Sequence, residues 1–153
     1  ANKENILLLD RVGNANNLGA IVRSAAFFGI KNIVIPLHEA QASITTSSYR
    51  VAQGGMEYVR LYTAQSLELF LKDIAGKIIR IGTDVHGTLP LTSLSEKTDK
   101  PKLVILGNEE EGISEEIKKL CDNLVTIPSP VDNIESLNVA QASSIILYEL
   151  SKN

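Results

Sequence analysis

The sequence has only one cysteine, Cys121, among its 153 residues. A single thiol excludes a disulfide framework and any zinc site built from several cysteines, and it fits a reducing compartment. No apolar run approaches the roughly 18 residues of a membrane span, and no signal-peptide pattern opens the chain. We therefore expect a cytoplasmic protein that holds neither a disulfide nor a membrane-spanning helix.

Several widespread functional motifs are missing as well. No Gly-x-Gly-x-x-Gly follows the first apolar run and no Gly-x-x-x-x-Gly-Lys-Ser/Thr is present, so neither a dinucleotide nor a nucleoside triphosphate has its usual cradle. His38 and Glu39 begin like a zinc-protease helix, but Ala42 stands where the second histidine is needed. With two histidines and no Gly-x-Ser-x-Gly, a hydrolase triad has little support. We expect no metal site.

The charge is low overall and uneven along the chain. The formal net charge is −3, which by itself does not indicate a nucleic-acid-binding protein. Residues 1–80 hold nine Lys and Arg against six Asp and Glu, whereas residues 81–153 hold six against twelve. This asymmetry fits either chance scatter over a solvated surface or a protein with one basic and one acidic face.

Short apolar runs alternate with segments of helical periodicity along the whole chain. Six apolar strands separated by helices predict an α/β fold with a mostly parallel six-stranded sheet, helices on both faces, and a single domain over 1–153. The expected strands are 6–9, 32–36, 58–62, 77–82, 103–106 and 124–127. The expected helices are 18–28, 45–53, 66–74, 114–120 and 136–150, with a polar loop at 88–102.

Three polar segments follow predicted strands, at the edge where open α/β sheets bind ligands. In the first, 14–23, Asn17 can cap the helix that follows. Arg23 lies about 9 Å further along that helix, and helical side chains lean toward the N-terminus, so its guanidinium can reach back toward the loop. The alternative interpretation is a capping asparagine and an unrelated surface arginine.

The second segment, 107–112, reads Gly-Asn-Glu-Glu-Glu-Gly after a buried strand. Its two glycines allow a tight turn or the close approach of a ligand. Three consecutive carboxylates repel phosphates, so a cationic or phosphate-free ligand suits this loop better than a nucleoside triphosphate. Alternatively, the acids together with Ser114 only favour the start of the following helix.

The third segment joins the last strand to the last helix. Ser136 is predicted to cap that helix and Asn138 to lie in its first turn, which leaves polar groups at the helix start. The helix is apolar around much of its circumference, so we expect it to be buried in the core or against another subunit. Taken alone, Ser136 is better interpreted as a cap than as a catalytic residue.

In this order and spacing, the three segments resemble the signature motifs of the SpoU/TrmH-type RNA ribose 2′-O-methyltransferases of the SPOUT superfamily. The resemblance runs from Leu7 to about Tyr148. The stretches that carry it are NNLGAIVRSAAFFG (16–29), LVILGNEEEGIS (103–114) and IPSPVDNIESLNVA (127–140). It implies a fold with a C-terminal trefoil knot that binds S-adenosylmethionine, and a homodimer with the first and last helices at its interface.

The resemblance also implies roles for particular residues. The five implied in catalysis are Asn17, Arg23, Glu109, Ser136 and Asn138. The four implied in cofactor binding, largely through backbone groups, are Thr83, Gly107, Ile127 and Leu137. The implied reaction is methyl transfer from S-adenosylmethionine to a ribose 2′-hydroxyl of tRNA or rRNA. Because an arginine side chain stays protonated in proteins and is therefore a poor base, we expect Arg23 to bind the adjacent phosphate and stabilise developing alkoxide charge.

Two other functions compete with this one. The first is a non-catalytic RNA-binding or assembly domain that retains the methyltransferase fold, and the second is a small-molecule methyltransferase. The chain begins without Met, and we expect it to be the catalytic part of a longer protein. Its RNA affinity would then depend on dimerisation or on a more basic segment elsewhere.

Overall fold

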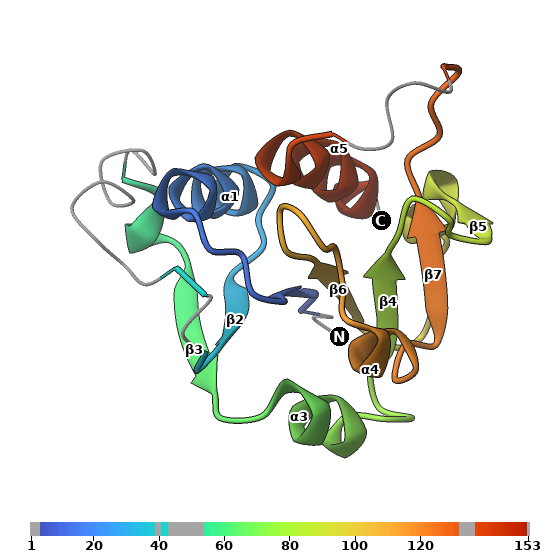
Figure 1. Cartoon of the computed structure of the whole chain (residues 1–153), viewed down its shortest axis with the longest axis horizontal. Coiled ribbons are helices and arrows are strands. Elements are labelled where there is room, and N and C mark those ends of the chain that lie inside the picture. Colours follow the sequence, from blue (N-terminus) through green and yellow to red (C-terminus); the bar gives the residue numbers. More distant parts are fainter. Residues whose placement is uncertain (1–3, 39–40, 43–53, 132–136, 153) are drawn as a thin grey trace.

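The computed structural model describes residues 4–38, 41–42, 54–131 and 137–152. These residues form a seven-stranded sheet in the order β3-β2-β1-β6-β4-β7-β5, and every strand pair is parallel (Figure 1). The strands are β1 (Ile6–Leu9), β2 (Asn32–Pro36), β3 (Arg60–Ala64), β4 (Ile79–Thr83), β5 (Leu89–Pro90), β6 (Lys102–Leu106) and β7 (Asn123–Thr126). The α-helices are α1 (Ala15–Phe27), α3 (Leu67–Asp73), α4 (Glu115–Lys118) and α5 (Val139–Ser151), with 3-10 turns at Gly55–Glu57 (η1) and Leu91–Ser95 (η2).

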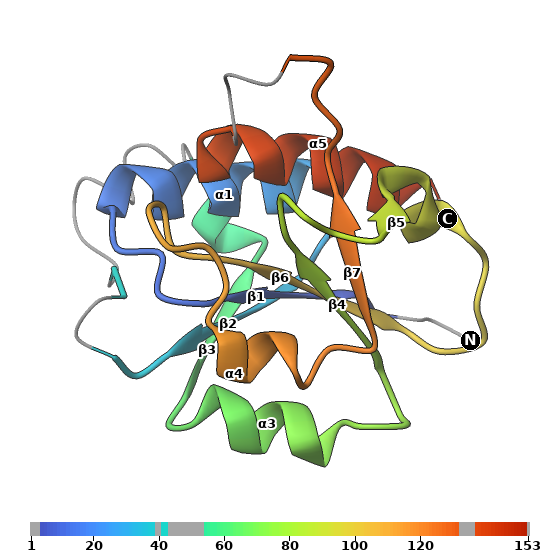
Figure 2. The same cartoon turned by 45° about the vertical axis from the view of Figure 1, so that its right-hand side comes forward.

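Helices cover both faces of the sheet, as the sequence predicts. Figure 2 shows α1 and α5 side by side on one face and α3 and α4 on the other. Because successive strand residues point to opposite faces, β1 contributes to both cores: Leu7 and Leu9 face α1 and α5, and Leu8 faces α3 and α4. The five residues of β6 are all buried. The chain thus builds a three-layer α/β domain with β6 near its centre.

The prediction of six strands is wrong, because the segment expected as a loop at 88–102 contributes a seventh. Leu89 and Pro90 pair with Val125 and Thr126 of β7. Two residues are too few to show an alternating pattern, and proline is tolerated there because β5 is an edge strand, where a backbone N–H is not needed on the outer side. The helix expected at 45–53 lies outside the described residues.

Two helix caps also differ from the prediction. Asn14, not Asn17, caps α1: its side chain accepts hydrogen bonds from the backbone N–H groups of Asn16 and Asn17. Asn138, not Ser136, caps α5 and accepts from Ala140 and Gln141 in the same way. Each of these residue types can cap a helix, and which one does so depends on where tertiary contacts fix the backbone.

Among the described residues, no helix is long and apolar enough to cross a membrane. Within the same ranges, no group of three or more His, Cys, Asp or Glu side chains is arranged to hold a metal ion.

Candidate functional site

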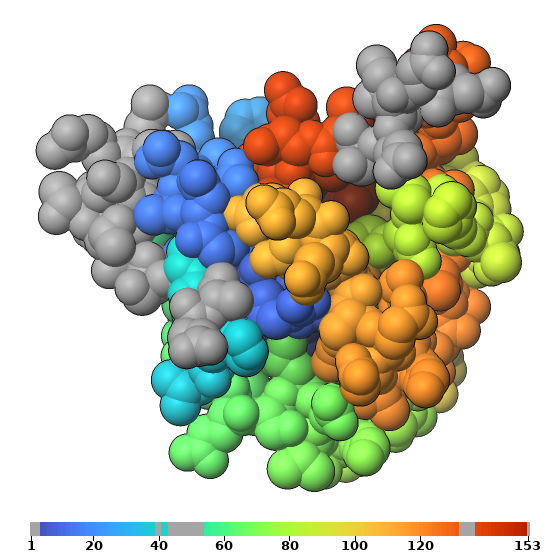
Figure 3. All heavy atoms as spheres, in the orientation of Figure 1, coloured from blue at the N-terminus to red at the C-terminus, as the bar shows by residue number. Residues whose placement is uncertain are grey.

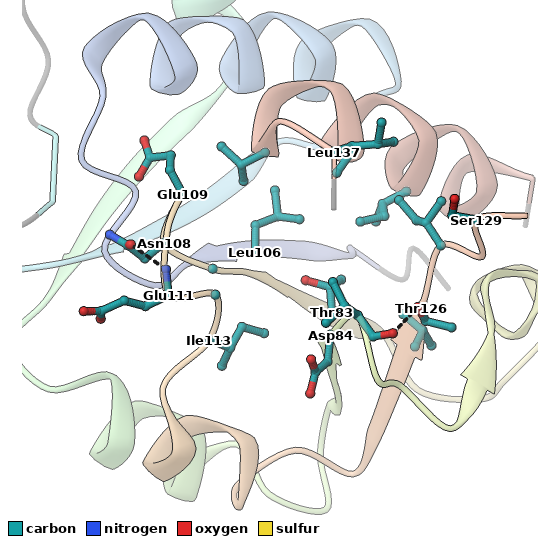
Figure 4. A pocket seen from close by; sticks show the side chains of 18 of the residues that line it. Thr83, Asp84, Leu106, Asn108, Glu109, Glu111, Ile113, Thr126, Ser129 and Leu137 are labelled. Atoms are coloured by element: carbon teal, nitrogen blue, oxygen red, sulfur yellow. Dashed lines mark hydrogen bonds between the residues drawn. The ribbon is translucent and has the colours of Figure 1, made fainter. Parts of the chain in front are cut away.

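A pocket of about 380 Å³ lies at the carboxyl ends of β4, β6 and β7, next to the start of α5 (Figure 4). Its volume lies within the range of small-molecule sites, about 300–1,000 Å³. Apolar side chains such as Leu106, Ile113 and Ile146 form part of the wall, and polar groups such as Asp84 and Glu109 form the rest. The pocket is therefore where a parallel sheet is expected to bind a ligand.

The four residues predicted to bind a cofactor all line this pocket. Thr83 ends β4, Gly107 follows β6, Ile127 follows β7, and Leu137 precedes α5. The Thr83 hydroxyl donates to the carbonyl oxygen of Ile105 at 2.8 Å, which fixes the end of β4 against β6. The structure thus brings together residues from four segments of the chain, and their role toward a ligand stays a prediction.

Gly107 begins a tight turn that closes one side of the pocket. Asn108 and Gly112 exchange two backbone hydrogen bonds, of 3.0 and 2.9 Å. Inside the turn, the side-chain oxygen of Asn108 accepts from the N–H groups of Glu110 and Glu111. A Cβ on Gly107 would lie 2.3 Å from the carbonyl carbon of Gly112. Only glycine therefore fits at position 107 without a shift of the backbone.

Glu109 connects this turn to the first polar segment. One carboxylate oxygen accepts from the N–H of Gly13 at 3.0 Å. The other accepts from the N–H of Asn14 at 2.9 Å and from the Asn17 side-chain amide at 3.1 Å. Asn17 in turn accepts from the Asn138 amide at 3.4 Å. Three of the five predicted catalytic residues thus form one polar cluster, made of Asn17, Glu109 and Asn138.

The Glu109 carboxylate is held in its charged form. Burial by itself would raise its pKa, but hydrogen bonds from Gly13, the Asn17 amide and Asn14 outweigh that effect and lower the pKa below the ordinary value. Because Glu109 also lines the pocket, a negative charge stands between the ligand pocket and the start of α1.

Of the other two predicted catalytic residues, Arg23 lies on the same helix as Asn17, and Ser136 is not among the described residues. Arg23 is an exposed residue of α1, six positions after Asn17. The η1 turn packs against the helix backbone at this point, since a Cβ on Gly55 would lie 3.1 Å from the Arg23 Cα.

Residues 4–148 match the SpoU rRNA Methylase family. The chain belongs to that family. A protein of Mycobacterium avium (strain 104), named as an uncharacterized tRNA/rRNA methyltransferase, is 34% identical over 148 residues, which are 96% of this chain and 47% of that protein. The chain therefore spans about half the length of such relatives.

Solved structures of SpoU methyltransferases share the fold. The SpoU methyltransferase AviRb from Streptomyces viridochromogenes, in complex with AdoMet, is 28% identical, with a TM-score of 0.86 over 99% of this chain and 58% of that one. The TrmH/SpoU tRNA modifying enzyme of A. aeolicus is 26% identical, with a TM-score of 0.85 over 99% and 75%.

An ion pair in the pocket wall of this SpoU-family chain was not predicted from the sequence. The ammonium of Lys118, on α4, lies 3.1 Å from a carboxylate oxygen of Asp84, which follows β4. Burial by itself would raise the Asp84 pKa, but the bonds from Lys118 and from the His86 N–H together lower it. The two residues are 34 positions apart in no recognisable motif, so no local signal indicates their contact.

Proposed function

We propose that this chain transfers a methyl group from S-adenosylmethionine to a ribose 2′-hydroxyl of tRNA or rRNA. One observation carries the proposal: Glu109 belongs both to the pocket wall and to the cluster with Asn17 and Asn138. A ligand in the pocket and a substrate beside α1 would therefore meet at one polar junction, as transfer of a group between them requires. Membership of the SpoU rRNA Methylase family supports this function.

The chemistry of the pocket fits S-adenosylmethionine. This cofactor carries a sulfonium cation and no phosphate, and the wall holds the carboxylates of 109–111 and the Asp84–Lys118 ion pair beside apolar side chains. An acidic wall favours a cation and disfavours a polyphosphate. Of the pocket residues, Thr83, Gly107, Ile127 and Leu137 would hold the cofactor. AviRb, whose fold the chain shares, binds AdoMet.

The residues beside the pocket would act on the RNA. When bound, the cofactor supplies an electrophilic methyl group on sulfur. Arg23 binds the phosphate next to the modified nucleotide and stabilises the negative charge that develops on the 2′-oxygen as its proton passes to solvent water. Asn17, Glu109 and Asn138 orient the ribose and Arg23, and Ser136 is proposed to assist them. Arginine does not serve as the base, because its guanidinium stays protonated in proteins and cannot accept a proton.

Two measurements test the proposed function. Calorimetry with S-adenosylmethionine should give a saturable heat, and incubation with total RNA and tritiated cofactor should label RNA that yields 2′-O-methylated nucleosides on digestion. No heat at high micromolar cofactor would favour a non-catalytic RNA-binding or assembly domain. Tritium found in a small molecule that ribonuclease does not alter, and not in RNA, would instead indicate a small-molecule methyltransferase.

The exposed apolar side chains of α1 and α5 support a homodimer through these two helices. Phe27 on α1 is 82% exposed, and Ile145 and Tyr148 on α5 are exposed as well. The two helices lie side by side on one face of the sheet (Figures 1 and 2), so they offer one joint surface to a second copy. Light scattering should give a molar mass twice that of one chain. A charged substitution at Phe27 should reduce the measured mass to that of a single chain.

We also propose a C-terminal trefoil knot, which the resemblance implies. The sheet order supports it, because β6 lies between the earlier strands β1 and β4 and β7 lies beyond β4.

We also propose a cytoplasmic location and an RNA affinity that depends on dimerisation or on a more basic segment outside these residues. Salt-dependent RNA binding by the longer protein, and none by these 153 residues alone, would support the last point.

A further inference from the structure

Arg11, directly after β1, has a backbone conformation that arginine rarely adopts. Its φ angle is +60°, and among the described residues it is the only one other than glycine with a positive φ. The left-handed region brings Cβ close to the following carbonyl oxygen, so a residue with a side chain stays there only when its surroundings hold it. The contacts of Arg11 must therefore outweigh this backbone cost.

Those contacts join two loops that are 100 residues apart in the sequence. The guanidinium lies 2.7 Å from a Glu111 carboxylate oxygen and donates to the carbonyl oxygen of Gly112 at 3.4 Å. In return, the Arg11 carbonyl oxygen accepts from the Asn108 side-chain amide at 2.8 Å. Figure 3 shows the amber 107–112 loop at the surface against the blue segment at the start of α1.

Asp10 fixes the guanidinium from the other side. It is 3% exposed, and one carboxylate oxygen lies 3.1 Å from the Arg11 Nε. The second oxygen accepts from the backbone N–H of Ser114 at 2.8 Å, at the start of α4. Because Asp10 is buried and hydrogen-bonded on both oxygens, it restricts the rotamers of the Arg11 side chain. The guanidinium is thereby directed at the 107–112 loop.

We propose that Arg11 is a positioning residue that locks the 107–112 loop against the β1–α1 segment and so sets the affinity of the pocket for its cofactor. This inference rests on the proposed function. Arg11 is not part of the pocket wall, but its partners Asn108, Glu111 and Gly112 are. A loop that is already ordered loses less conformational freedom when a ligand binds, so removal of the lock lowers affinity without removing a ligand contact.

Two substitutions test the lock: Arg11→Lys keeps a cation beside the buried Asp10, whereas Arg11→Gly removes it. Glycine adopts a positive φ at no steric cost, so the glycine variant relieves the backbone while it removes the side-chain contacts. Arg80→Ala is the matched control: Arg80 also pairs with an aspartate, Asp122 at 2.9 Å, and donates to the carbonyl oxygen of Leu71. It lies at the amino end of β4, away from the pocket.

The first readout is hydrogen exchange in the absence of any ligand. The amides of Glu110, Glu111 and Gly112 are all hydrogen-bonded to Asn108 within the turn. We expect them to exchange at least tenfold faster in Arg11→Gly than in the parent chain, and at an unchanged rate in Arg80→Ala. Unchanged loop exchange in Arg11→Gly would overturn the inference, and so would equally faster exchange throughout the chain, which is what a merely structural role would produce.

The second readout is the calorimetric Kd for S-adenosylmethionine. We expect Kd to rise at least tenfold in Arg11→Gly, to rise less in Arg11→Lys, which retains the charge near Glu111, and to stay within twofold in Arg80→Ala. Equal Kd values for the parent chain and Arg11→Gly would overturn the inference alone. Absence of binding by the parent chain would overturn the proposed function and the inference together.

Discussion

The side-chain amide of Asn17 lies 3.1 Å from the carboxylate of Glu109, a residue 92 positions later in the chain. Glu109 also accepts from two backbone N–H groups just before α1, so it satisfies donors that a helix start leaves free. A carboxylate at a helix N-terminus is also favoured by the helix dipole. One side chain of the pocket wall therefore determines where α1 begins and how Asn17 is oriented.

The variant Glu109→Gln should destabilise the fold by about 1 kcal/mol, because an amide cannot accept at both ends and one backbone donor is left facing an NH₂ group. Urea unfolding measures the change. The neighbouring Glu110→Gln, at an exposed position in the same loop, should change stability by less than about 0.5 kcal/mol. Equal effects of the two substitutions would contradict the contacts of Glu109.

The same contact should depend on pH. The Glu109 pKa is lower in the folded chain than its ordinary value of 4.5, so its charged form stabilises the folded state above that value. This contribution is lost as the pH falls through the lowered pKa. The stability difference between the parent chain and Glu109→Gln should therefore be constant at neutral pH and shrink below about pH 4.5. A difference that grows on acidification would show that the carboxylate is not stabilised by its partners.

Two glycines of the 107–112 turn should respond differently to alanine. At Gly107 the added Cβ would meet backbone atoms at 2.3 Å, whereas at Gly112 it meets nothing within 4 Å and the cost comes only from a φ of +71°. We expect Gly107→Ala to cost roughly 3 kcal/mol or more and Gly112→Ala about 1–2 kcal/mol. Urea unfolding midpoints rank the stabilities of the two variants. A larger loss of stability in Gly112→Ala than in Gly107→Ala would contradict the geometry of this turn.

Cys121 should be a poorly reactive thiol. Burial raises its pKa to about 11, although nearby Arg80 acts in the opposite direction. At pH 8 roughly 0.1% of such a thiol is thiolate, against about a quarter of an ordinary cysteine with a pKa near 8.5. Alkylation by iodoacetamide, followed by mass spectrometry, should be at least tenfold slower in the native chain than in urea. Equal rates would show that the half-buried position does not protect the sulfur.

Local patterns were sufficient to predict most of the fold and the place of the site. Apolar runs such as 103–106 predict buried strands, and the rule that ligands bind at the carboxyl ends of parallel strands predicts the edge where the 107–112 loop lies. Thr83 was predicted only from the family resemblance. The strand β5 could not be predicted, because two residues are too few to show the alternating pattern of a strand.

The contacts that complete the site could not be predicted in this way. Asn14 and Asn17 have the same capping chemistry, and only the distant Glu109 distinguishes them. The pairing of Asp84 with Lys118 and the lock around Arg11 join residues 34 and 100 positions apart. Such contacts follow from how the layers pack, which no local period encodes.

Arg23 carries the clearest functional prediction. Arg23→Ala should lower the single-turnover rate of RNA methylation by roughly 10²–10³-fold, the usual effect of removing one group that stabilises developing negative charge. Arg23→Lys should retain part of the rate, because the ammonium keeps the charge but not the two-pronged geometry. The side chain is exposed on α1, so thermal stability should change little in either variant.

The control for Arg23 removes the same charge elsewhere. Arg60 is also exposed. It is the first residue of β3, so it lies at the amino ends of the parallel strands, whereas the pocket lies at their carboxyl ends. If Arg23 acts only through net charge, Arg60→Ala should slow methylation as much, and the salt dependence of RNA binding should change equally in both variants. If Arg23 stabilises the reacting oxygen, Arg60→Ala should keep the single-turnover rate within about twofold at saturating RNA, since an exposed charge so far from the reacting atoms is screened. Full activity in Arg23→Ala would remove this residue from the mechanism.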